Sequence, residues 1–552
     1  MPGGAGSSEG RVPGPKGGRE RGAGSSGVRV PGSKGGKERG SSGGVGASQV
    51  RVSGRGGGPE VSEHHARAVV VGTGFGGGVA ALRLAEAGVD TLVLERGVRW
   101  PTGPDATTFP RVDGLDRRAG WLTDRSTTPG VFTTWQPYTG LVETLRARGT
   151  TVNCAAGVGG GSLVSHGMVL QPPEDHFALS LPALADLYGE LDAWAYPTVA
   201  RMLRLATIPD DVLAAEPYRS SRLFLDAAEK AGLETFRLPV PVDWDYVRGE
   251  LDGRYAPTYT TGDLAYGVNN GGKHSVDATY LAAAEATGRV AVASLHLVRD
   301  LALDPRGRWL LRVDRLDTDG EVQEHKTITA DAVFLAAGSP GTTRLLVKAR
   351  AKGLVPDLPD AVGTGWGNNG NRAYAWVQMD DDPGRPQGGP SCVGGRDPGS
   401  PLPYTVVHAG SPILPPSPAR MMALAGCGIV RPEGRWEYDA DADDAILTWP
   451  RSADADVAKL IAERMDAFAD TGGGMVVETA PVEPATWHPL GGVPVGEAVD
   501  AHGRVLGHRG LYVLDGSRVP GSTGACGPAM TIAAFAEHSM AALVRSDLGE
   551  VF

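Results

Sequence analysis

The sequence predicts an α/β fold that contains a Rossmann-like dinucleotide-binding domain. Three consecutive features predict it: a run of β-branched residues at 66–71, a glycine-rich loop at 72–77, and a helical segment that ends at Gly88. A second short strand at 91–94 follows and ends on Glu95. A strand, a glycine loop, a helix and a strand-terminal acid in this order are typical of a nucleotide-binding βαβ unit.

The residues of this unit take distinct roles. Gly72 permits the tight turn, Gly74 lets the backbone approach a pyrophosphate, and Gly77 lets the helix pack on the strand. The helix N-terminus presents oriented N–H groups to the phosphates. Glu95 suits the ribose hydroxyls of an adenosine half. The motif therefore predicts a dinucleotide site, but it does not distinguish FAD from NAD.

Length and composition bound the class of protein. The 552 residues are 41% hydrophobic, which is enough for more than one domain, and the net charge of -11 argues against a nucleic-acid partner. No apolar run approaches the ~20 residues that a membrane span needs. The four cysteines have no metal-ligand spacing, so we expect reduced thiols and no metal site. They are Cys154, Cys392, Cys427 and Cys526.

The first 65 residues differ sharply from the rest of the chain. They consist mainly of Gly, Ser, Pro, Arg and Lys, and a short polar sequence that begins at Arg11 returns at Arg29. Residues 1–65 are therefore predicted to be a disordered low-complexity tail. No signal peptide is visible, which favours the cytoplasm; secretion stays open if the true start lies downstream, near Val61.

Later segments also carry secondary-structure patterns. Residues 292–299 and 308–314 alternate like strands around a turn at 304–307, and residues 457–468 have helical periodicity.

Several segments far from the first motif are rich in glycine and other small residues. They cover 157–168, 333–346, 488–492, 510–517 and 520–534. An extended cofactor needs backbone contacts from such distant segments. The arrangement resembles the glucose-methanol-choline (GMC) flavoenzymes, and within that family the cholesterol oxidases, from about residue 66 to about residue 545. The stretches that carry the resemblance most closely are 72–88, 157–172, 266–281 and 362–371.

The resemblance implies a fold of two parts. A Rossmann-like FAD-binding domain is expected from 66–170, 270–355 and 486–547. A discontinuous α+β substrate-binding domain, with a mostly antiparallel sheet over the flavin ring, is expected from 171–269 and 356–485.

The resemblance also implies the residues of the active site. His488 aligns with the family's active-site histidine, which serves as the base beside the substrate hydroxyl. FAD is expected to be bound noncovalently, because His166 is not at the position where some relatives tether the cofactor. Besides the glycines already described, the implied FAD contacts are Phe75, Gly76, Glu95, Gly161, Ser165, Met168, Val298, Gly516 and Ala529.

Three departures from the family pattern concern chemistry. Gly527 stands where cholesterol oxidases carry an asparagine that contacts the hydroxyl and the flavin, and losing one preorganised polar contact costs on the order of 10²–10³ in rate. His408 falls near the position of the family's carboxylate for double-bond isomerisation, where a buried structural histidine is an equal alternative. Ser165 and His166 replace an Asn-Gly pair.

These features predict an FAD-dependent oxidase. We expect it to oxidise a secondary hydroxyl of a sterol to a ketone, with oxygen as acceptor and peroxide as product, as a monomer with at most transient membrane contact. One alternative is a GMC flavoenzyme that acts on another hydroxylated lipid or secondary metabolite with a different acceptor. A second is a flavin-binding protein with little turnover, which Gly527 favours and His488 opposes. An NAD-dependent dehydrogenase remains a further alternative.

Overall fold

The computed structural model describes residues 62–103, 108–126, 132–410, 420–480 and 484–552. These residues belong to one unit that spans Gln49–Phe552. Most of the predicted tail lies outside the described residues. Residues 62–65, however, extend the first strand, so this strand begins four residues earlier than the sequence predicted.

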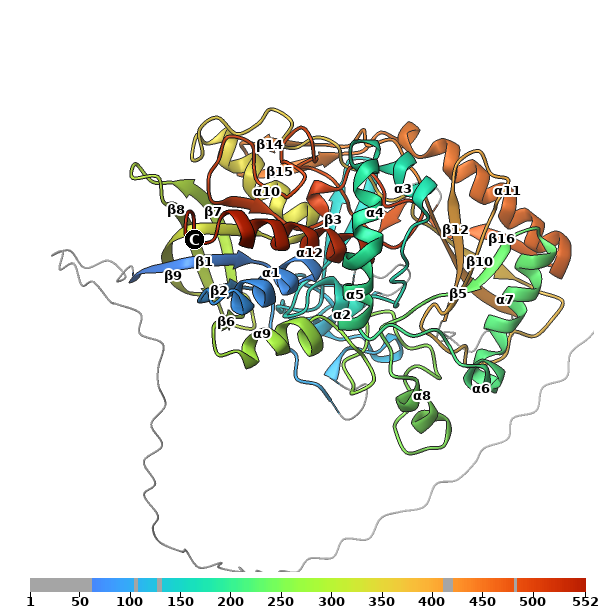
Figure 1. Cartoon of the computed structure of the whole chain (residues 1–552). Coiled ribbons are helices and arrows are strands. Elements are labelled where there is room, and N and C mark those ends of the chain that lie inside the picture. Colours follow the sequence, from blue (N-terminus) through green and yellow to red (C-terminus); the bar gives the residue numbers. More distant parts are fainter. Residues whose placement is uncertain (1–61, 104–107, 127–131, 411–419, 481–483) are drawn as a thin grey trace, which may run out of the picture. The chain divides into compact units, whose positions relative to one another are not determined.

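A seven-stranded sheet carries the predicted nucleotide-binding unit (Figure 1). Its order is β6-β2-β1-β9-β8-β7, and β18 also pairs with β9. β2, β1, β6, β9 and β18 are linked by parallel pairs, whereas β7, β8 and β9 form an antiparallel meander. The strands are β1 Ser62–Val71, β2 Thr91–Leu94, β6 Val290–Ala293, β7 His296–Leu303, β8 Trp309–Leu316, β9 Val322–Leu335 and β18 Leu511–Val513.

Helices cover this sheet because its central strands are buried and apolar. The three valines at 69–71 are at most 4% exposed, as a strand covered on both faces requires. α1 packs against α12 and α9 and joins β1 to β2, as predicted from its glycine loop. α10 follows β9 directly. These helices are α1 Phe75–Glu86, α9 Ala282–Ala286, α10 Gly338–Ala351 and α12 Ala529–Ser546.

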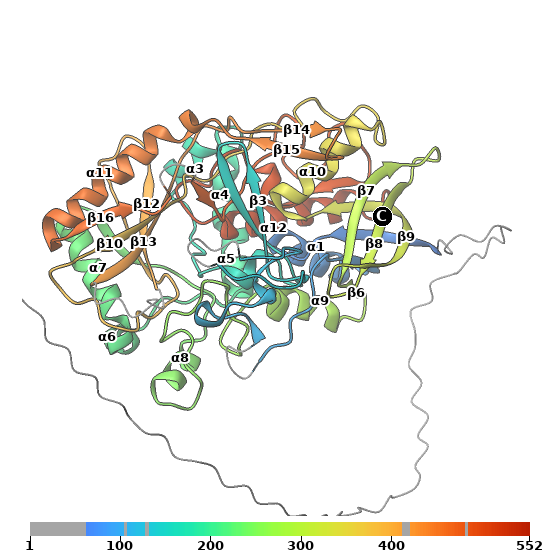
Figure 2. The same ribbon diagram turned by 180° about the vertical axis from the view of Figure 1, so that it is seen from behind.

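A second, six-stranded sheet is antiparallel throughout, in the order β16-β10-β13-β12-β11-β5. α7 and α11 lie along one face of it (Figure 2) and bury Phe224 and Phe468 there. The strands are β5 Glu234–Arg237, β10 Arg372–Val377, β11 Val393–Arg396, β12 Tyr404–Ala409, β13 Met421–Gly428 and β16 Met475–Glu478. The two helices are α7 Arg219–Lys230 and α11 Ala455–Gly472, the latter enclosing the predicted helical segment.

Two small sheets and several short helices complete the described part of the chain. The hairpin of β3 and β4 pairs with β17, and β14 pairs with β15. The strands are β3 Val142–Ala147, β4 Thr150–Ala155, β14 Arg435–Asp439, β15 Asp444–Thr448 and β17 Ala485–Thr486. The helices are α2 Gly161–Val164, α3 Glu174–Ser180, α4 Tyr188–Glu190, α5 Tyr196–Met202, α6 Asp210–Ala214 and α8 Trp244–Leu251.

The mixed α/β class is confirmed. The strands of the seven-stranded sheet lie in segments predicted for the FAD domain, apart from the first four residues of β1, and those of the six-stranded sheet lie in segments predicted for the second domain. The exact domain boundaries stay a prediction. Among the described residues no helix has the length and apolarity to cross a bilayer, and the four cysteines are free thiols.

Candidate active site

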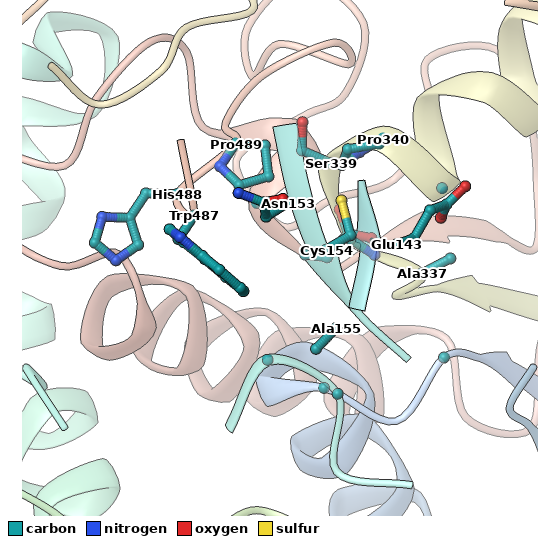
Figure 3. Close-up of a pocket in the computed structure, with 18 of the residues that line it drawn as sticks. Glu143, Asn153, Cys154, Ala155, Ala337, Ser339, Pro340, Trp487, His488 and Pro489 are labelled. Atoms are coloured by element: carbon teal, nitrogen blue, oxygen red, sulfur yellow. Dashed lines mark hydrogen bonds between the residues drawn. The ribbon is translucent and has the colours of Figure 1, made fainter. Parts of the chain in front are cut away.

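A cavity of about 1070 Å³ runs between the two large sheets. Pockets that hold a ligand typically measure ~300–1,000 Å³, so this cavity is at the upper end of that range and suits an extended ligand. Figure 3 shows Trp487 and His488 on one side of this space, and Glu143 with the start of α10 on the other. Twelve of the predicted site residues line it: Gly72, Gly74, Phe75, Gly76, Glu95, Gly161, Ser165, Met168, Val298, His488, Gly516 and Ala529.

Glu95 joins the two glycine-rich loops, 72–77 and 157–168, at the predicted nucleotide end of the cavity. The Oε2 atom accepts a hydrogen bond from Thr73 Oγ1 at 2.6 Å, and Oε1 accepts from the Gly97 and Gly157 backbone N–H groups at 2.9 and 3.3 Å. A carboxylate has about four acceptor positions, so Oε2 retains capacity for a hydroxyl donor from the cavity. Glu95 therefore fits the predicted ribose contact while it holds the loops together.

The glycines divide into those that pack and those that face the cavity. A Cβ at Gly72 would lie 2.2 Å from the Ala336 carbonyl oxygen, and one at Gly77 would lie 2.1 Å from the Gly72 oxygen. Gly77 thus packs α1 on the strand, as predicted, and is not a cavity residue. A Cβ at Gly161 or Gly338 would meet nothing within 4 Å, so backbone there is open to a ligand.

The C-terminal segment ties α10 to the cavity through Asp515. Its Oδ2 atom accepts from the Gly338 N–H at 2.8 Å and from Thr342 Oγ1 at 2.5 Å, and Oδ1 accepts from the Ser517 N–H at 2.9 Å. Burial raises the pKa of Asp515. Gly516 follows directly and lines the cavity. The oriented N–H groups at the start of α1 are suited to anionic phosphates, whereas the Gly338 N–H at the start of α10 is taken by Asp515.

A buried lysine, Lys273, holds the second glycine-rich loop in place. Lys273 Nζ donates to the carbonyl oxygens of Leu163 and Ser165 at 2.6 and 3.1 Å, and burial lowers the pKa of Lys273 to about 7. Ser165 and Met168 face the cavity from this loop. Lys273 lies in the stretch 266–281, which resembles the GMC flavoenzymes, but no role was predicted for it from the sequence.

His488 lies in a hydrogen-bonded network that spans two segments. Its Nδ1 atom is 3.0 Å from Asn371 Nδ2, and its backbone N–H donates to Thr486 Oγ1 at 2.9 Å. The Thr486 hydroxyl lies 2.8 Å from Asn371 Oδ1 and 3.0 Å from the Asn368 carbonyl oxygen. His488 Nε2 makes no hydrogen bond to any described residue. The ring is therefore held at Nδ1 and free at Nε2.

Burial sets the charge state of this end of the cavity. It lowers the pKa of His488 to about 4, and the neighbouring His166 adds to the effect. The pKa of His166 is also lowered to about 4, by burial and by the charge of Lys273. Both imidazoles are therefore neutral at pH 7, and His488 is a candidate base. From its sequence position, His166 was expected to replace part of the family's Asn-Gly pair and to lie off the tethering position; its place beside His488 was not predicted.

The six-stranded sheet presents a wall of small side chains to the cavity. Alternate residues of β12 line it, because successive side chains of a strand point to opposite faces, and residues of β10 and β13 line it as well. They include Ala373 of β10, Thr405, Val407 and Ala409 of β12, and Ala425 and Cys427 of β13. Such a wall leaves room for a bulky apolar molecule.

His408 does not belong to this wall, which corrects the hypothesis of a proton-moving role. Its neighbours Val407 and Ala409 line the cavity, so its own side chain points to the helical face of β12. There it is fully buried, with Nδ1 3.3 Å from Ser221 Oγ and the ring beside Phe224. Nε2 has no hydrogen-bond partner, and burial lowers the pKa of His408 to about 3. The structure therefore supports the alternative that His408 is a buried structural histidine.

This buried histidine should make the fold sensitive to acid. The pKa of His408 in the fold, about 3, is below the ~6.5 of an unfolded histidine, so its stabilising contribution is present above pH 6.5 and is lost as the pH falls. Between pH 6.5 and 4.5, the free energy of unfolding of the unchanged chain should fall by about 2–3 kcal/mol more than that of His408→Leu. Urea unfolding of both proteins at the two pH values measures this, and equal losses would contradict it.

Gly527 does not line the cavity, although Pro528 and Ala529 do. Its N–H donates to Met168 Sδ at 3.1 Å, and a Cβ here would lie 2.8 Å from the Met168 carbonyl oxygen. An asparagine at 527 therefore needs a shift of the Met168 backbone. The adjacent Cys526 is no substitute, because its Sγ accepts from Arg396 Nη2 at 3.2 Å and is absent from the cavity lining.

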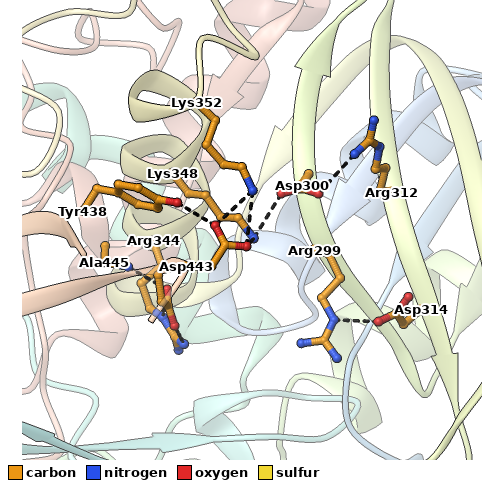
Figure 4. Close-up of polar contacts among 11 residues, drawn as sticks. Arg299, Asp300, Arg312, Asp314, Arg344, Lys348, Lys352, Tyr438, Asp443 and Ala445 are labelled. Atoms are coloured by element: carbon orange, nitrogen blue, oxygen red, sulfur yellow. Dashed lines mark hydrogen bonds and ion pairs between the residues drawn. The ribbon is translucent and has the colours of Figure 1, made fainter. Parts of the chain in front are cut away.

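A charged cluster borders the cavity near Val298 and ties α10 to the β14–β15 hairpin (Figure 4). Asp443 accepts from Lys352 Nζ and the Tyr438 hydroxyl at 2.9 and 2.6 Å, and Lys348 Nζ bridges it to Asp300 at 3.2 and 3.1 Å. Val298, the predicted adenine contact, lies beside Asp300 at a register shift of β7. The cluster pairs its charges internally, which makes it a structural brace.

Comparison with known proteins bears on the class of protein. Residues 441–536 match the family model of the GMC oxidoreductases. This segment is therefore similar to the C-terminal domain of those enzymes, and the predicted resemblance to the family is confirmed there. The matched segment contains His488, Gly516 and Ala529.

Individual relatives have low sequence identity to this chain. A cholesterol oxidase from Mycobacterium tuberculosis is 29% identical over 317 residues, 53% of this chain and 50% of that protein. One from Acinetobacter baumannii is 26% identical over 53% of this chain and 52% of that protein. The chain spans about half the length of these relatives. The solved pyridoxine 4-oxidase from Mesorbium loti has a TM-score of 0.56 at 16% identity, over 86% of this chain and 99% of that one, and is similar in fold.

Proposed function

We propose that this protein is an FAD-dependent oxidase that converts a secondary alcohol to a ketone. The observation that carries the proposal is the position of His488, neutral and with Nε2 free, in the same cavity as the two glycine loops and Glu95. Removal of a hydride from carbon requires a group that receives the hydroxyl proton, and Nε2 of a neutral histidine can receive it.

The chain's residues fit noncovalent FAD. The start of α1 would receive the phosphates, Glu95 the ribose, and Val298 the adenine side. Ser165, Met168, Gly516 and Ala529 would lie along the isoalloxazine. When bound, FAD supplies a hydride acceptor, which no amino-acid side chain provides. Lys273 keeps the second glycine loop in place for this contact.

A sterol or another rigid apolar alcohol is the substrate that the cavity favours. The alanine, valine and threonine side chains of the six-stranded sheet leave space and offer few hydrogen bonds, which suits a polycyclic body better than a small polar one. The cholesterol oxidases among the relatives agree with this choice. Oxygen is the proposed acceptor. Double-bond isomerisation is not proposed, because His408 faces away from the cavity.

The test is an anaerobic titration of the purified holoprotein with cholesterol, followed by the oxidised flavin absorbance. Bleaching is the expected result, and admission of air should then restore the colour and release peroxide. A yellow protein that stays yellow with cholesterol overturns the sterol assignment. A colourless protein that binds no added FAD overturns the cofactor assignment.

A different alcohol is the second candidate, because the structural neighbour's name refers to pyridoxine. The same titration with pyridoxine, run in parallel, separates the two. Bleaching by pyridoxine alone would favour a small polar alcohol, and bleaching by cholesterol alone would favour the sterol.

A further inference from the structure

His488 contacts a loop more than one hundred positions away in the sequence, the segment 368–371. Three asparagines of this loop differ in what they contact. Asn368 and Asn369 are at most 1% exposed and bind within the protein: Asn368 Nδ2 donates to Asp454, and Asn369 Nδ2 donates to the Cys526 carbonyl oxygen at 2.8 Å. Asn371 alone among them lines the cavity.

The loop that carries Asn371 is fixed by the contacts around it. Asn369 and Gly370 have φ of 56° and 62°, the left-handed region that an asparagine and a glycine tolerate best. Arg372 Nη1 donates to the Asn371 carbonyl oxygen at 2.8 Å and pairs with Asp454 at 3.0 Å, both side chains of that pair being at most 7% exposed. The Asn371 amide is therefore held at a defined distance from His488.

The network around His488 admits two complete proton arrangements. In the first, the Thr486 hydroxyl donates to Asn371 Oδ1 and the Asn371 amide N–H donates to His488 Nδ1, so Nε2 carries the ring proton. In the second, the amide is rotated by half a turn: His488 Nδ1–H donates to Oδ1, the amide N–H donates to Thr486 Oγ1, and the Thr486 hydroxyl donates to the Asn368 carbonyl oxygen. Nε2 then carries a lone pair. Heavy-atom positions are the same in both, because amide O and N exchange places.

We infer that Asn371 is the positioning residue that selects the tautomer of His488, with Thr486 as its partner. This inference rests on the proposed role of His488 as the base. Only the second arrangement lets Nε2 take the hydroxyl proton, whereas the first makes Nε2 a hydrogen-bond donor to an oxygen atom. Rotation of one amide therefore converts the same imidazole from acceptor to donor without adding a charge to a buried site.

Two substitutions at Asn371 separate this role from mere packing. Asn371→Asp offers Nδ1 only acceptors, so it should hold the base tautomer and favour the protonated ring. The acid limb of the kcat/KM–pH profile should move up by about 1–3 pH units. Asn371→Leu keeps the size and removes both hydrogen bonds, and we expect kcat/KM to fall on the order of 10²–10⁴-fold, the range seen when a catalytic histidine loses its tautomer-setting partner.

Thr486 supplies a matched pair. Thr486→Val removes the hydroxyl and should lower the rate on the order of 10-fold, consistent with loss of about one hydrogen bond. Thr486→Ser keeps the hydroxyl and should restore the rate. Retention of full activity and an unmoved acid limb in both Asn371 variants would overturn the inference, as would equal rates in Thr486→Val and Thr486→Ser.

A direct readout keeps this test separate from the proposed function. Nitrogen NMR of the holoprotein labelled in its histidine rings reports which ring nitrogen carries the proton, and His488→Asn identifies the signal by its loss. We expect Asn371→Asp to give a single Nδ1–H form and Asn371→Leu to abolish that preference. If these signals shift as expected while no alcohol is turned over, the positioning role stands and the proposed substrate falls. An unchanged tautomer in both variants overturns the role even in an active enzyme.

Discussion

His488→Ala should lower the rate of hydride removal from the alcohol on the order of 10²–10⁴-fold, because the hydroxyl proton would lose its proposed acceptor, His488 Nε2. FAD should remain bound, since the residues proposed to hold it are untouched. Stopped-flow measurement of flavin bleaching under anaerobic conditions gives the rate. In the unchanged protein the acid limb of kcat/KM should lie near pH 4, because burial lowers the pKa of His488 to about 4.

The matched control for this variant is His508→Ala. His508 lies outside the cavity lining, on the same C-terminal segment, where its Nε2 is 3.3 Å from the Asp357 carbonyl oxygen. We expect it to keep the rate of the unchanged protein. A His488→Ala enzyme that bleaches within a factor of a few of the control would remove His488 from the mechanism.

Glu95→Ala should abolish stable cofactor binding. The carboxylate is 5% exposed and accepts hydrogen bonds from Thr73 and Gly157 in the two glycine loops and from Gly97. Its removal leaves the Gly97 and Gly157 N–H groups unsatisfied. Each such buried donor costs about 1–3 kcal/mol, and the lost ribose contact adds to the effect. We expect the affinity for FAD to fall by at least about 100-fold, which corresponds to ~3 kcal/mol. Fluorescence titration of the apoprotein with FAD measures it.

Glu86→Ala serves as the comparison, because it is the same substitution at the end of α1, within the same βαβ unit. Glu86 is half-exposed and pairs with Arg83 at 2.6 Å, an exposed contact of about 0–1 kcal/mol. FAD affinity should be unchanged in Glu86→Ala. If Glu95→Ala bound FAD as tightly as Glu86→Ala, Glu95 would not be the ribose ligand, and the adenosine half of FAD would have to bind at another part of the cavity.

The nucleotide-binding end was the most predictable part of the molecule. Strand, glycine loop, helix and acid lie within about thirty residues, so their geometry follows from local rules. The segments that resemble the GMC flavoenzymes extended the prediction beyond this unit, because each of them has a known place in that fold. β1 was still underestimated at its start, where Ser62 to His65 pair with β9, a strand that lies more than 250 residues further along the chain.

The other end of the cavity could not be predicted in detail. Whether His408 faced the cavity depended on the register of β12, and a one-residue difference reverses the face of every side chain. The contact between Asn371 and His488 joins positions 117 residues apart, and the motif that contains Asn371 carries no sign of which asparagine points inward. Such contacts are set by the packing of the two sheets, which no local pattern reports.

The close approach of Gly527 to Met168 also limits how an amide could be added at this end of the cavity. A side chain at 527 is blocked by a backbone oxygen 2.8 Å away, and backbone yields less readily than a flexible side chain. Replacing Gly527 by asparagine therefore requires the 168 segment to move as well. An amide is more easily introduced at a position whose side chain already faces the cavity.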